Sequence, residues 1–109
     1  MAAIYSTKFL VGNTDDANLV YQVQPGFVAV LRDVVVYNNS AIAAELFLED
    51  FATGAAIWRW DNSIIDTNLP AGSQQWQGRQ VFGPEEGFRF RASEGTWDFR
   101  ACGYLLTAP

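Results

Sequence analysis

The chain has 109 residues, of which 50% are apolar and 15% aromatic, while only 17% are charged. This length predicts a single domain over residues 1–109, and the apolar content excludes a disordered chain. Twelve acidic against seven basic residues give a net charge of −5, so nucleic acid and anionic membranes, which attract clustered Lys and Arg, are not expected partners.

The first part of the chain shows hydrophobicity with a period of two, which is typical of β-strands. It predicts strands over residues 4–11, 19–24 and 27–37, the last of which is dense in β-branched side chains and follows a Pro-Gly turn signal. Arg32 and Asp33 interrupt this third run. They predict that the strand passes there from a covered region to an edge or rim of the sheet.

Residues 43–51 are predicted as a strand rather than a short helix, because Leu46 and Leu48 alternate with acidic and aromatic positions. Residues 61–69 are polar and irregular and are predicted as a loop that crosses between sheets. Further strands are predicted over 55–60, 74–82, 87–92 and 96–106, and tight hairpin turns containing Gly or Pro at 53–54, 69–73, 83–87 and 93–95. About eight short antiparallel strands favour an all-β fold, a single β-sandwich or jelly roll.

The charged residues near the C-terminus have a structural interpretation. Alternation along a strand sends Arg89 and Arg91 to one face of the predicted strand 87–92. A hairpin closed at residues 93–95 would bring them beside Asp98 and Arg100. The expected result is a solvated cross-strand ladder rather than a catalytic surface.

The sequence contains no histidine, which removes the commonest general base and metal ligand. We therefore expect no catalytic residues, no metal site and no cofactor. Three pairs of carboxylates are adjacent in sequence: Asp15-Asp16, Glu49-Asp50 and Glu85-Glu86. Because adjacent strand residues point to opposite faces, the two carboxylates of a pair are not expected to face one substrate, as glycosidase chemistry requires. The single cysteine, Cys102, excludes an internal disulfide and is interpreted as a small filler within a strand.

Four residues are candidates for an interface or a glycan contact: Trp58, Trp60, Trp76 and Arg79. Trp58 and Trp60 share one strand face, so the pair could stack sugar rings, with hydrogen bonds from Asp61, Asn62, Gln75 and Gln77. The alternative, which we favour, places these tryptophans in the core or at a subunit interface, because Trp dominates buried contacts.

Several segments together resemble a known family. They are "YSTKF", "YQVQPGFVAVLRDVVVYNNS" and "WQGRQVFGPEEGFRFRASEGTWDFRACGYLLT". In this pattern a Pro-Gly turn leads into an aromatic-Val-Ala-Val-Leu-Arg-Asp strand. A Trp-x-Gly-Arg-Gln-Val strand then leads to a Pro-acid-Gly turn, and a final strand ends in Gly-Tyr-Leu-Leu. The chain is similar to the small β-sandwich virion proteins of tailed bacteriophages, especially those of actinobacterial hosts. The resemblance covers most of the chain except residues 39–69.

The N-terminus has no basic segment ahead of an apolar stretch, so no signal peptide is expected. The resemblance implies a non-enzymatic virion component, either capsid decoration or a minor tail protein, made in the bacterial host cytoplasm. Its implied partners are other capsid or tail proteins and further copies of itself, with a homotrimer as the expected form. Arg32, Asp33, Trp76 and Arg79 would then fix strand ends or subunit contacts. The alternative role is a carbohydrate- or receptor-binding module of a phage tail that contacts host-surface glycan through exposed Trp residues.

Overall fold

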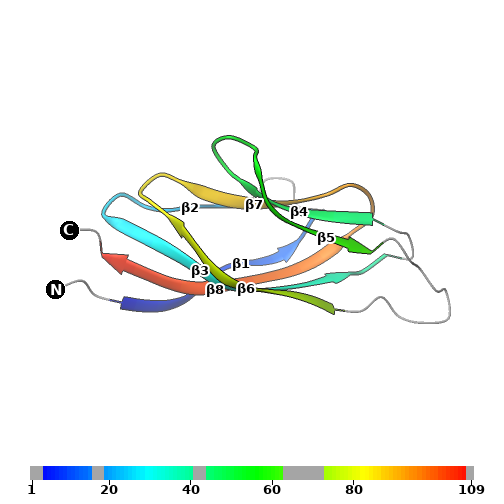
Figure 1. Cartoon of the computed structure of the whole chain (residues 1–109), viewed down its shortest axis with the longest axis horizontal. Coiled ribbons are helices and arrows are strands. Elements are labelled where there is room, and N and C mark those ends of the chain that lie inside the picture. Colours follow the sequence, from blue (N-terminus) through cyan, green and yellow to red (C-terminus); the bar gives the residue numbers. More distant parts are fainter. Residues whose placement is uncertain (1–3, 16–18, 41–43, 63–72, 108–109) are drawn as a thin grey trace.

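The computed structural model describes residues 4–15, 19–40, 44–62 and 73–107. Within these ranges the chain forms eight β-strands and no helix (Figure 1). The strands are β1 (Ile4–Asn13), β2 (Val20–Gln22), β3 (Phe27–Asn38), β4 (Ala44–Asp50), β5 (Ala56–Asn62), β6 (Ser73–Phe82), β7 (Gly87–Ala92) and β8 (Trp97–Thr107).

The strands form two four-stranded sheets that lie face to face, with orders β1-β8-β3-β6 and β2-β7-β4-β5 (Figure 1). The antiparallel pairs are nested: β1 pairs with β8, β2 with β7, β3 with β6 and β4 with β5. The β3–β8 and β4–β7 pairings join these pairs into the two sheets. This nesting is the connectivity of a jelly roll, which confirms the predicted all-β fold.

The core lies between the sheets and is built from alternate residues along each strand, whose side chains point inward. Val34 and Val36 of β3 face Leu46 and Leu48 of β4 in one buried cluster. Aromatic rings fill the remaining space, and one stacked pair joins the two sheets: the rings of Phe90 (β7) and Phe99 (β8) lie 4.3 Å apart between centroids. Each large apolar side chain buried here contributes about 1.5–3 kcal/mol to folding.

The predicted hairpins are mostly wrong, although the strands they connect are present. Only the turn that contains Thr53-Gly54 joins neighbouring strands of one sheet, β4 and β5. Residues 83–87 and 93–95 connect strands of different sheets. Gly and Pro mark where the chain reverses but do not determine whether it returns to the same sheet. The turn predicted at 69–73 and the loop at 61–69 fall largely outside the described residues.

Arg32 and Asp33 do not mark a sheet edge, because β3 has neighbours on both sides, β8 and β6. They mark a β-bulge: the register of β3 with β8 shifts between Leu31 and Asp33, so Arg32 is an extra residue. A second bulge on the other side of β8 makes Phe9 the extra residue in β1. Both bulges flank Cys102 of β8. At the neighbouring Gly103, a Cβ atom would lie 1.9 Å from the carbonyl oxygen of Val30.

Candidate interaction surface

The outward side of the β1-β8-β3-β6 sheet carries more cations than carboxylates, and we call it the basic face. Four exposed basic side chains, Lys8, Arg32, Arg79 and Arg100, lie on it. Strand alternation and register place only two acidic residues on the same side, Asp33 and Asp98. Four cations against two carboxylates leave this face with a formal charge of +2 on a chain whose net charge is −5.

The four cations of the basic face form no ion pair within the described residues. The ion pairs formed within the described ranges all involve Arg59, Arg89 or Arg91, which belong to the other sheet. Exposed apolar side chains lie between the basic residues, namely Val11, Val35, Val81 and Tyr104. A mixed surface of unpaired cations and exposed apolar groups is typical of a protein contact site.

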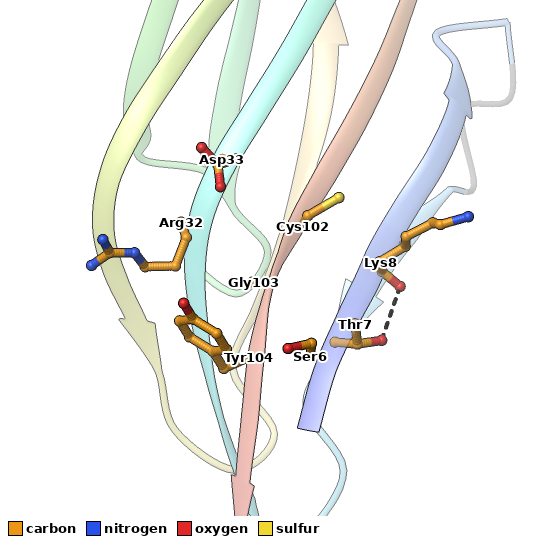
Figure 2. Close-up of a pocket in the computed structure, with 8 residues that line it drawn as sticks. All are labelled: Ser6, Thr7, Lys8, Arg32, Asp33, Cys102, Gly103 and Tyr104. Carbon is orange, nitrogen blue, oxygen red and sulfur yellow. Dashed lines mark hydrogen bonds between the residues drawn. The ribbon is translucent and has the colours of Figure 1, made fainter. Parts of the chain in front are cut away.

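The basic face contains a shallow, open depression of about 380 Å³. Figure 2 shows Arg32 of β3 on one side and Lys8 of β1 on the other, with Tyr104 and Ser6 between them. The lining is completed by Thr7, Asp33, Cys102 and Gly103. The two β-bulges lie on either side of β8 at this level, so the same irregularities that bend the sheet also shape the depression.

The outward side of the other sheet is electrostatically balanced. Glu49 of β4 is only 5% exposed, and its two carboxylate oxygens accept hydrogen bonds from Arg89 Nε at 3.3 Å and Arg91 Nε at 3.1 Å. Arg91 also covers the ring of Phe47, with its guanidinium carbon 4.4 Å from the ring centroid. Burial of Glu49 therefore orders two arginines on β7.

This arrangement corrects the predicted charge ladder. Arg89 and Arg91 lie across from Glu49 and Phe47 of β4, whereas Asp98 and Arg100 belong to β8 in the other sheet. The structure has a part-buried cross-strand charge cluster in place of the predicted solvated ladder, and its acidic member comes from a strand forty residues earlier. Sequence spacing alone suggested the wrong neighbour because β7 and β8 are consecutive without being paired.

The three candidate tryptophans lie on the edge strands β5 and β6. Trp60 is 3% exposed, and its Nε1 donates to the carbonyl oxygen of Gln75 in β6 at 3.4 Å. Trp76 is half-buried and packs against the core, whereas Trp58 is 49% exposed. Trp58 and Trp60 therefore do not present two open rings to one ligand, which removes the geometry that a paired stacking platform requires.

The remaining residues singled out in the sequence do not gather at one site. Arg79 is exposed on β6 as part of the basic face, and Cys102 is half-buried at the depression. The side chain of Asp50 accepts hydrogen bonds from the backbone of Ala52 and Thr53 and so holds its own turn. Asp16 lies outside the described residues.

Neither a metal site nor a membrane helix appears in the part of the chain that the structure describes. No three metal-ligating side chains gather there. No described helix is long and apolar enough to span a bilayer.

Comparisons with known proteins give likenesses of fold. No protein-family model matches the sequence, and no curated protein matches it. A chain of the virus-like particle of the extra small virus of the giant freshwater prawn Macrobrachium rosenbergii is 12% identical, with 99% of this chain and 80% of that chain covered and a TM-score of 0.45. A chain of the T13 IBDV viral particle is 11% identical, with 97% of this chain and 31% of that chain covered and a TM-score of 0.49. Both similar structures are thus chains of viral particles.

Proposed function

We propose that this chain is a non-enzymatic structural protein of a bacteriophage virion, present in repeated copies as capsid decoration or as a minor tail component. Its proposed partners are other virion proteins and further copies of itself, with a homotrimer as the expected assembly.

The observation that carries the proposal is where the segments that resemble phage virion proteins lie. The Phe27-to-Asp33, Trp76-to-Val81 and Gly103-to-Leu106 segments belong to β3, β6 and β8, which are neighbours in one sheet. Two of the residues that the resemblance links to contacts, Arg32 and Arg79, are exposed on the outward side of that sheet. The resemblance therefore concerns a continuous surface as well as a folding pattern, as expected for a protein that acts by contact.

Quantitative mass spectrometry of virions purified from the phage that encodes the chain tests this proposal. We expect the chain to co-purify with the particles at a fixed ratio to the major capsid protein. Hundreds of copies per particle would indicate capsid decoration, and a few copies would indicate a tail part. A chain that is abundant in the lysate but absent from purified particles would contradict a virion role.

The second candidate function, glycan binding by a phage tail, now depends on Trp58 alone among the β5 tryptophans. Its side chain is 49% exposed, and an exposed indole can stack on a sugar. Glycan-array binding that is lost in Trp58→Ala, with an unchanged unfolding midpoint, would favour this function. Binding that survives the substitution, or no binding at all, would leave the contact role.

A further inference from the structure

Basic side chains are confined to the strands of this fold, whereas acidic side chains occur both in strands and in turns. All seven Lys and Arg residues lie in strands. In the described ranges the acidic residues outside the strands are all exposed, and they are Asp15, Glu85, Glu86 and Glu94. One copy of the chain therefore offers a cationic sheet face and anionic sandwich ends, which are complementary surfaces for a second copy.

The turn between β6 and β7 contains two acidic residues, Glu85 and Glu86. We call residues 83–86 the acidic turn. The Glu86 N–H donates to the Gly83 carbonyl oxygen at 3.1 Å, with Pro84 and Glu85 between them. Val23, which follows β2 in the same chain, holds the turn through two backbone hydrogen bonds: the Glu85 N–H donates to the Val23 carbonyl, and the Val23 N–H donates to the Glu86 carbonyl. The Glu86 carboxylate accepts a hydrogen bond from the Gly83 N–H at 2.7 Å and so stabilises the acidic turn itself.

Glu85 is the unusual residue of the acidic turn. Its φ of 70° lies in the left-handed region, at the third position of a turn with proline second, where glycine is the favoured residue. Within the described ranges its carboxylate has no hydrogen-bond or ion-pair partner. A strained backbone that holds an exposed, unpaired carboxylate points to a role for that carboxylate outside its own chain.

We propose that the acidic turn of one copy docks in the depression on the basic face of the next copy, with the Glu85 carboxylate facing Arg32. The depression is open, and Arg32 and Lys8 flank it with their charged ends pointing outward from β8 in opposite directions. The hydroxyls of Ser6 and Tyr104 and the carboxylate of Asp33 also line it. Its two cations outnumber its one carboxylate, which suits an incoming acidic turn. This docking rests on the proposed function, since both require repeated copies.

The contact is head to tail, because the two surfaces are different parts of one molecule. The acidic turn lies at the end of the sandwich where β1 begins and β8 ends (Figure 1), whereas the depression lies on a sheet face. Each copy can therefore donate one turn and receive another. Such heterologous contacts close into rings when the rotation permits and otherwise continue as arrays.

Sedimentation velocity of the full chain over a range of protein and salt concentrations tests the docking. We expect self-association that weakens as salt rises, because the attraction is between solvent-exposed charges. Arg32→Glu and Glu85→Lys should each raise the dissociation constant at least about tenfold. An equimolar mixture of the two variants should associate again, since it contains one intact turn and one intact depression.

Matched controls separate docking from net charge and from folding. Glu94→Lys and Arg59→Glu make the same charge changes elsewhere and should leave self-association unchanged. Glu85→Gly suits the left-handed position, so it should keep or raise the unfolding midpoint while it weakens association. These variants are compared by thermal unfolding before sedimentation.

Three outcomes would overturn the docking: a strictly monomeric wild type, association that is insensitive to salt, or equal effects of the control and test variants. The docking and the proposed function fail separately. A chain found in virions whose Arg32→Glu variant associates normally would overturn the docking alone. A chain that associates through this contact but is absent from virions would overturn the virion role alone.

Discussion

Trp58 and Trp60 are two positions apart in β5, yet they differ sharply in exposure, at 49% and 3%. Trp60→Ala should lower the free energy of unfolding by about 3–5 kcal/mol, because it removes a buried indole and leaves a cavity. Trp58→Ala should cost about 1 kcal/mol, since half of that ring is already in water. Urea denaturation of the two variants makes the comparison, and equal losses would contradict it.

Tyr21 connects residue packing to pH. Its ring lies against Phe9 and Phe88, at centroid distances of 4.7 and 5.6 Å, and burial raises the pKa of its hydroxyl above the ordinary 10.0 because the phenolate is poorly solvated there. The unfolded chain then loses this proton at a lower pH than the folded chain does. Stability therefore falls as the pH rises through the unfolded pKa toward the folded one.

Tyr21→Phe tests this linkage because it removes the hydroxyl and keeps the ring. Between about pH 8 and about pH 11 the urea midpoint of the wild type should fall further than that of the variant. All other residues are identical in the two proteins, so the difference between their midpoints reports Tyr21. Parallel losses in the two proteins would show that Tyr21 contributes nothing to the alkaline limit.

At the scale of elements, the buried carboxylate of Glu49 links β4 to β7. Glu49→Ala should lower the free energy of unfolding by about 1–3 kcal/mol. The loss stays below that of a fully buried ion pair because Arg89 and Arg91 are about half exposed and regain water. Glu45→Ala is the matched control, since Glu45 forms a 3.7 Å pair with Arg59 on the solvated side of the same strand.

The control should cost at most about 0.5 kcal/mol, as is usual for an exposed pair. Chemical denaturation of both variants at neutral pH gives the comparison. If Glu45→Ala proves as costly as Glu49→Ala, burial is not what makes the Glu49 pairing important.

At the scale of the whole molecule, a single apolar cluster joins both sheets. We therefore expect unfolding in one cooperative step, in which Trp fluorescence and far-UV circular dichroism change at the same denaturant concentration. This outcome would support the prediction of one domain over residues 1–109. Two separated transitions would contradict it.

Much of this architecture was predictable from local pattern. The alternation of Leu46 and Leu48 with acidic and aromatic neighbours predicted a strand over residues 43–51, and β4 covers Ala44–Asp50 with both leucines fully buried. The prediction that Trp58 and Trp60 share a face follows from the same period, but alternation does not report which position is covered. That depends on where the partner sheet ends over an edge strand, which is a property of the assembled sandwich.

The sequence by itself determined the strands, because period-two burial, β-branched residues and Gly or Pro turns act over a few residues. Only the tertiary structure decided the pairing. β7 pairs with β4 rather than with β8 because closing two sheets over one core depends on contacts between residues far apart in the chain. That choice places Glu49 between Arg89 and Arg91.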